Sequence, residues 1–231
     1  MQKILIFLVS LLLSGLLYAE PAALLVYKVW EQGGEPYFSR ILVTARHVRM
    51  DEGRDRGDFT LFDRDEETLF NVAADERSVL ILEPQLDEVS EAKDLILSEQ
   101  VSVDQDAPRI AGKQPETIDL FANDEKCARV VAVQGLMEDA VSGLRELRKV
   151  LSRIHSATQA RQPAEMPGAC DQADNIHAPT RFLDHGLPIE QHSKGSVQLL
   201  IDFSEQYEAD PVLFKVPDDF NRLRLPALPM I

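Results

Sequence analysis

The sequence predicts an α+β protein in which an antiparallel sheet carries a long amphipathic helix on one face. Between residues 37 and 84, β-branched and aromatic residues alternate with polar ones in short runs. Turn signals separate these runs, and tight turns can join only antiparallel neighbours. After Val133 the apolar period changes from two to alternating steps of four and three, which is typical of a helix.

Five strands are expected in the central segment, over residues 37–44, 46–51, 58–63, 68–74 and 77–83. Residues 78–82 are apolar on both faces, as in a strand at the centre of a sheet. Glycines at 53 and 57 bracket a charged turn, because glycine takes positive φ without strain. Further strands are expected over residues 24–30, 117–122, 127–133, 180–184, 187–192, 195–204 and 212–216. Residues 94–103 fit a strand or a short helix equally well.

The helix is expected over residues 136–157. Its apolar stripe consists of Val133, Met137, Ala140, Leu144, Leu147, Leu151 and Ile154. Arg145, Arg148 and Arg153 are placed outside this stripe. Such a stripe packs on a core more often than on a partner, and a sheet is available to receive it.

The N-terminus has the pattern of a secretory signal peptide. A short cationic start is followed by an apolar run over residues 4–17, which is short for a membrane span. Cleavage after Ala19 is expected, with sites near Ala22 or Ala23 as alternatives, and an uncleaved anchor is the competing interpretation. We therefore expect a periplasmic protein whose mature chain has no transmembrane segment.

The composition limits the partners. The chain of 231 residues has a formal net charge of −15, and a protein with that balance lacks the clustered Lys and Arg that phosphate backbones require. Nucleic acid is therefore not expected as a partner. The two cysteines, Cys127 and Cys170, are expected to form a disulfide, because an even count in an exported chain is typical of one.

No pattern in the sequence indicates an enzyme, a metal site or a cofactor. Histidines and aspartates gather between residues 171 and 192, but the tight ligand pairs of zinc sites are lacking. Residues 51–58 resemble a calcium loop only in composition, since the alternating acids and the closing Glu are missing. A nucleophile elbow of the form G-x-S-x-G does not occur.

Three segments resemble a known family. They read VRMDEG over residues 48–53, DFTLFDR over residues 58–64 and FKVPDDF over residues 214–220. Together with the export signal and an aromatic first strand, they resemble exported bacterial proteins related to the periplasmic lipoprotein-carrier (LolA/LolB-like) fold, especially a branch of unknown function. The resemblance covers about residues 24–83 and 181–220, and implies an incompletely closed β-barrel with a helix in its open face. Residues 1–19 would be the signal peptide, residues 20–231 one domain, and about 117–179 a hairpin-helix insertion.

This resemblance implies a binding or carrier module for an apolar ligand, such as a lipid or an acyl chain. The alternative is a structural protein of an envelope assembly, with a filled core and another envelope protein as partner. The expected apolar ligand or core face consists of Tyr27, Trp30, Phe59, Phe62, Met137, Leu144, Leu147 and Leu151.

Overall fold

The computed structural model describes residues 19–84, 89, 92, 94–161 and 168–224. The predicted signal peptide, apart from Ala19, lies outside the described residues. The strands are β1 (Glu20–Glu31), β2 (Tyr37–Val43), β3 (His47–Asp51), β4 (Phe59–Asp63), β5 (Thr68–Ala73), β6 (Ser78–Leu82), β7 (Leu97–Ser102), β8 (Pro115–Ala122), β9 (Glu125–Val133), β10 (Leu187–Ser193), β11 (Ser196–Ala209) and β12 (Asn221–Arg224). The helical segments are α1 (Glu138–Arg161), α2 (Ala169–Gln172), the π-helical turn η1 (Ala173–His177) and the 3-10 turns η2 (Arg181–Leu183) and η3 (Pro211–Phe214).

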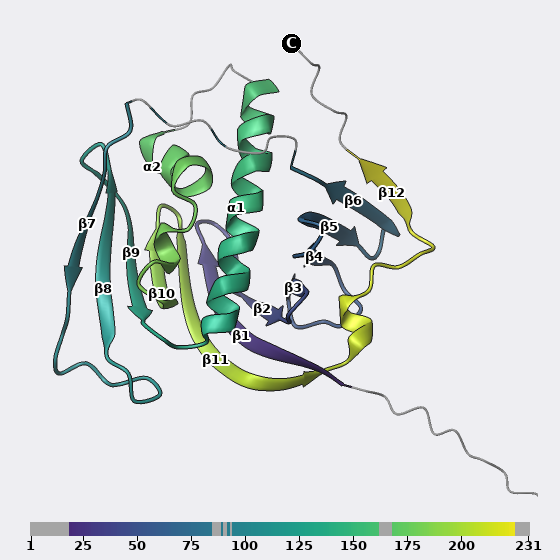
Figure 1. Cartoon of the computed structure of the whole chain (residues 1–231), viewed down its shortest axis with the longest axis horizontal. Helices are drawn as coiled ribbons and strands as arrows, with labels where there is room; N and C mark the ends of the chain where they lie inside the picture. The colour runs from purple at the N-terminus through teal and green to yellow at the C-terminus, as the bar shows by residue number, and fades with distance from the viewer. Residues whose placement is uncertain (1–18, 85–88, 90–91, 93, 162–167, 225–231) are drawn as a thin grey trace, which may run out of the picture.

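The described strands form one open sheet of 12 strands, in the order β12-β6-β5-β4-β3-β2-β1-β11-β10-β9-β8-β7. Neighbouring strands pair antiparallel except β12, which runs parallel to β6. The sheet is therefore mixed and mainly antiparallel, which agrees with the predicted α+β class. Figure 1 shows that it curves around α1, with β7–β9 on one side and β3–β6 on the other.

The long pair β1–β11 joins the two halves of this sheet. Pairing runs from Glu20 opposite Ala209 to Glu31 opposite Ser196, with bulges on the way. Bulges increase local twist and bend a strand, which suits a sheet that wraps around a helix. This pair lies near the middle of the sheet, whereas residues 37–84 contain the meander β2–β6 on one side of it.

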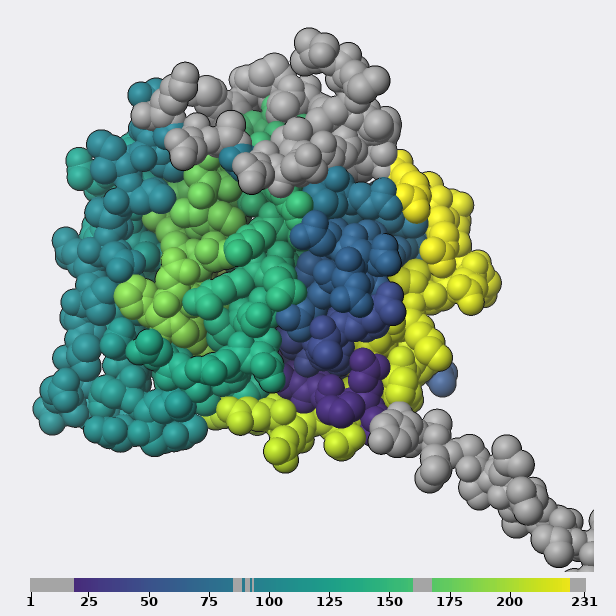
Figure 2. All heavy atoms as spheres, viewed as in Figure 1, coloured from purple at the N-terminus to yellow at the C-terminus, as the bar shows by residue number. Residues whose placement is uncertain are grey.

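The main core lies between the sheet and α1. All seven residues of the predicted apolar stripe belong to it, together with sheet residues such as Leu25, Val43, Val48 and Phe62. The helix predicted over residues 136–157 is present as α1, which begins two residues later than predicted and ends four residues later. Figure 2 shows that atoms of α1 also form part of the molecular surface, between the two ends of the sheet.

The closest approach of α1 to the sheet is at Gly143. A Cβ atom there would lie 2.7 Å from Cγ1 of Val43 and 3.1 Å from Cγ2 of Val48, and both valines are buried. These distances are shorter than a carbon–carbon contact, which is about 3.5–4.0 Å at its optimum. Because glycine has no Cβ atom, the helix can pack closely against strands β2 and β3 at this position.

Gly143→Ala is expected to lower the free energy of unfolding by about 1–2 kcal/mol. Alanine gains up to about 1 kcal/mol in helix propensity, but overpacking a rigid core costs about 1–3 kcal/mol. Urea unfolding of the two proteins measures the difference. Lys149→Ala on the exposed side of α1 is the control. A Gly143→Ala variant more stable than the parent would contradict this packing.

The C-terminal segment, residues 211–224, covers the outer face of β2–β6, which is the face turned away from α1. Leu213 and Phe214 of η3 pack there with Leu42 and Leu61, and Phe220 packs with Val79 and Ile81. The buried Arg49 donates from Nη1 to the carbonyl oxygen of Leu213 at 2.6 Å. This cover explains why β6 is apolar on both faces although only β12 separates it from the edge, so its predicted central position is wrong.

Two predicted strands are 3-10 turns instead. Residues 180–184 form η2, in which Leu183 N–H donates to the carbonyl of Thr180. Residues 212–216 overlap η3, where Asp210 caps the turn by accepting from the Val212 N–H at 2.9 Å. In both segments short-range hydrogen bonds override the β propensity of the side chains, and in η3 the capping side chain of Asp210 adds to them.

Other segments also differ from the prediction. The helical segments α2 and η1 and the strand β12 were not predicted. The ambiguous region contains the strand β7. The division into a signal peptide and one domain with an insertion stays a prediction. In the described part of the chain, no helix combines the length and the hydropathy needed to cross a membrane.

Candidate functional site

A cavity of about 270 Å³ lies between α1 and the strands β1, β2, β10 and β11. Helix α1 contributes Leu144, Leu147 and Leu151 to its wall, and the turn η2 contributes Phe182 and Leu183. Apolar side chains with a few polar groups are the usual lining of small-molecule sites. The volume lies just below the range of about 300–1,000 Å³ typical of drug-sized ligands, so it suits one slender apolar group.

Tyr27 forms part of the cavity floor on β1. Its hydroxyl donates to the carbonyl oxygen of Pro188 at 2.8 Å, and burial raises the pKa of this phenol well above its ordinary value. The hydrogen bond joins β1 to the start of β10 across the concave side of the sheet. Tyr27 therefore stays a neutral, oriented ring rather than a titrating group.

Arg148 is the charged residue of this cavity. It follows Leu144 by four residues and precedes Leu151 by three, so it lies on the same side of α1 as the apolar stripe. The side chain is half-buried, and burial lowers the pKa of its guanidinium. Within the described residues, no carboxylate forms an ion pair with Arg148. Its Cζ atom lies 5.8 Å from the centroid of the Phe182 ring.

The nearest acid, Asp174, is already engaged by another arginine. Arg181 Nε donates to Asp174 Oδ1 at 2.6 Å, and Arg181 Nη1 donates to the carbonyl oxygen of Phe121 at 2.9 Å. The guanidinium of Arg181 lies 5.9 Å from the Phe182 ring centroid. Asp174 is thus paired with Arg181, which leaves Arg148 without an ion-pair partner among the described residues.

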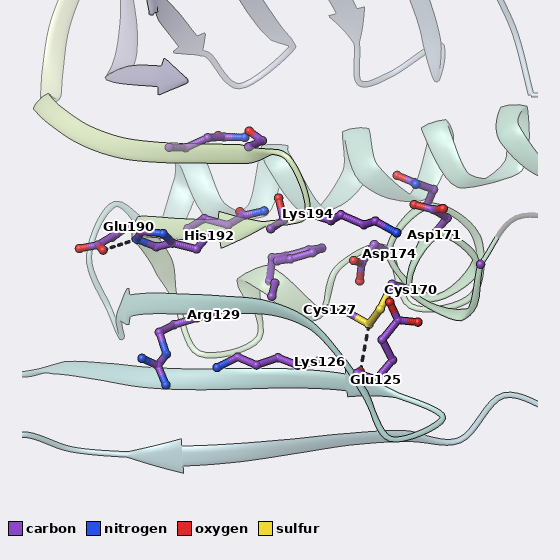
Figure 3. A pocket seen from close by; sticks show the side chains of 18 of the residues that line it. Glu125, Lys126, Cys127, Arg129, Cys170, Asp171, Asp174, Glu190, His192 and Lys194 are labelled. Carbon is purple, nitrogen blue, oxygen red and sulfur yellow. Dashed lines mark hydrogen bonds and ion pairs between the residues drawn. A yellow bond between two sulfur atoms is a disulfide. The ribbon is translucent and has the colours of Figure 1, made fainter. Parts of the chain in front are cut away.

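A polar groove of about 1020 Å³ adjoins the cavity (Figure 3). It lies over the neighbouring strands β9, β10 and β11, beside α2 and η1. Glu125, Asp171 and Glu190 line it together with Lys194 and His192, so both signs of charge are present. Arg148, Phe182, Gln191 and Gln198 border the groove and the cavity alike.

The predicted disulfide is present at the edge of this groove (Figure 3). Cys127 at the start of β9 is bonded to Cys170 in α2, with Cα atoms 5.2 Å apart. This pair packs with Ala122 and Ala173 in a small apolar cluster. It therefore holds α2 and η1 against the end of the sheet that forms one wall of the groove.

The residues of the predicted apolar face do not form one surface. Tyr27, Leu144, Leu147 and Leu151 line the cavity, whereas Phe62 and Met137 are buried in the same core without lining it. Phe59 belongs to the outer clusters under the C-terminal segment. Trp30 alternates with the buried Val29 along β1, so it points to the outer side, where Lys28 Nζ lies 4.9 Å from its ring centroid.

Sequence reasoning placed Arg148 on the polar side of the helix, and this assignment is wrong. The spacing of four from Leu144 and three from Leu151 was a signal available in the sequence. Phe182 was read as part of a strand and its role could not be recognised. The residues first considered as metal ligands are spread over separate contacts, and in the described ranges no three His, Cys, Asp or Glu side chains are grouped to hold a metal ion.

Neither a scan against protein-family models nor a search of curated proteins finds a match for this chain.

Proposed function

We propose that this protein is a binding or carrier module for an apolar ligand, held between the curved sheet and α1. The cavity is the main support for this proposal, because leucines and aromatic rings line it between α1 and the sheet. Burial of each methylene of a ligand there is worth about 0.8 kcal/mol. The open sheet that curves around α1 supports the same function, because the lipoprotein carriers that the sequence resembles are expected to hold their ligand between a curved sheet and a helix.

We also propose that the protein acts in the periplasm after cleavage of its signal peptide. The disulfide supports an oxidising compartment. Cleavage after Ala19 would leave the first strand complete, since Glu20, Pro21 and Ala22 pair with β11. Cleavage near Ala22 or Ala23 would remove these pairs, so the earlier site is favoured.

A structural role in an envelope assembly is the second candidate. The edge strand β7 favours it, because all six of its residues are exposed. Leu97 and Val101 lie on one face of this strand, and Ile96 and Val103 flank it as further exposed apolar residues. An edge of this kind can pair with a strand of another protein.

The ligand is expected to bind in the cavity and to be displaced by a larger side chain there. Leu144→Phe should reduce the affinity for the neutral probe 1-decanol about tenfold, because it fills the cavity with a ring. Leu199→Phe on the exposed outer face of β11 is the matched control and should bind like the parent. Displacement of a fluorescent naphthylamine measures binding, and native mass spectrometry shows any ligand that co-purifies.

A consistently ligand-free mass together with no uptake of 1-decanol would remove the carrier function and leave the structural role. Equal binding by Leu144→Phe and the parent would place the ligand outside this cavity.

A further inference from the structure

The charge balance at the mouth of the cavity is unusual for this protein. The chain as a whole is strongly acidic, yet among the described residues Arg148 forms no ion pair, because the nearby Asp174 is bonded to Arg181. Burying a charge is costly unless an opposite charge compensates it. Burial also lowers the pKa of the Arg148 guanidinium, as expected for a cation that lacks a full partner.

We propose that the ligand is a single-chain amphiphile with a carboxylate at one end, and that Arg148 is the counter-ion of this carboxylate. This inference rests on the proposed function. The chain would occupy the cavity between α1 and the sheet. The carboxylate would lie where the cavity meets the polar groove. A guanidinium presents a planar pair of N–H donors that matches the two oxygens of a carboxylate.

The position of Arg148 supports this arrangement. It lines the apolar cavity and the polar groove at once, so an anionic group bound to it leaves the attached chain free to enter the cavity. Gln191 and Gln198 border the same junction, and their side-chain amides can donate to a carboxylate oxygen.

The groove beyond the junction argues for an end group of low charge. Glu125, Asp171 and Glu190 line it alongside Lys126, Arg129 and Lys194, so the groove offers no net positive charge to a group that carries several negative charges. A carboxylate has a single negative charge, which the guanidinium of Arg148 can match. The volume of the cavity, about 270 Å³, suits one short chain rather than several.

Two probes that differ only in their end group test the inference. Decanoate is anionic at pH 7.5 because its carboxyl has a pKa near 4–5, whereas 1-decanol is neutral. The full-length mature protein is expected to bind decanoate about 10- to 100-fold more tightly than 1-decanol, as measured by displacement of a fluorescent probe.

Arg148→Met keeps an unbranched side chain and removes the guanidinium with its charge. It should abolish the preference for decanoate while leaving the affinity for 1-decanol within a factor of about two or three. Arg148→Lys should retain part of the preference, because the charge remains but the paired donors do not. Lys149→Met is the matched control: it removes the same charge from the next, exposed position of α1 and should leave the preference intact. Circular dichroism verifies that each variant is folded.

The outcomes are distinguishable. A preference for decanoate that only Arg148→Met eliminates establishes the role of Arg148. Binding of 1-decanol without a preference for decanoate, or a preference that Arg148→Met leaves unchanged, overturns the inference while the apolar-ligand function stands. Binding of neither probe overturns both.

Discussion

Leu147→Ala is expected to lower the free energy of unfolding by about 2–5 kcal/mol. Leu147 lies in the middle of α1, is 3% exposed and belongs to the core between the helix and the sheet. Its truncation removes apolar contacts and enlarges the adjoining cavity, and both effects destabilise a packed interior. Urea unfolding of the purified parent and variant gives the difference directly.

Lys149→Ala is the appropriate control, because this side chain is exposed on the same helix and should change stability by less than about 0.5 kcal/mol. Arg148 cannot serve as a control for surface charge, since it borders the cavity. If the apolar stripe were a docking surface for a partner, Leu147→Ala would leave the unfolding midpoint unshifted and would weaken association instead. An unshifted midpoint would therefore contradict the position of α1 in the core.

Loss of the Cys127–Cys170 disulfide is expected to lower the free energy of unfolding by about 3–4 kcal/mol in the chain-entropy model. The two cysteines are separated by 43 positions, so the bond restricts a long segment of the unfolded chain. It also fastens α2 and η1 to the start of β9. The variant Cys127→Ala/Cys170→Ala, compared with the parent by thermal and urea unfolding without reductant, measures this effect.

Hydrogen exchange adds a local test of the disulfide. The amide groups of η1 and the start of β9 should lose protection in the double variant, whereas those of the distant β3–β4 pair should change only with global stability. Ser193→Ala near the tip of the β10–β11 hairpin is a control that leaves the disulfide intact. Two freely alkylated thiols in the native parent protein would contradict the bond itself.

The sequence alone determined the elements whose signals are local. The strands β2–β6 follow from alternating residues between turn signals, and α1 follows from its stripe of apolar residues at steps of four and three. The disulfide also followed without a structure, because two cysteines in a chain predicted to be exported allow only one intramolecular pairing. Each of these conclusions depends on residues close together in the chain or on a count.

Only the tertiary structure decided how these elements are assembled. The pairing of β1 with β11, the parallel addition of β12 and the cover over the outer face depend on contacts between residues far apart in the chain. Periodicity shows which residues of a strand share a face, but not which neighbour the strand pairs with. For the same reason the sequence could not show that Trp30 and Phe59 lie away from the cavity.

Arg148 shows most clearly where local reasoning ends. Its charge predicts a solvent-exposed position, whereas its spacing from Leu144 and Leu151 predicts a position on the buried side of α1. An arginine can satisfy both tendencies, because its long apolar stem packs along a core while the guanidinium reaches a polar region. Whether such a region exists depends on η2 and on the β10–β11 hairpin, which come near α1 only in the folded chain.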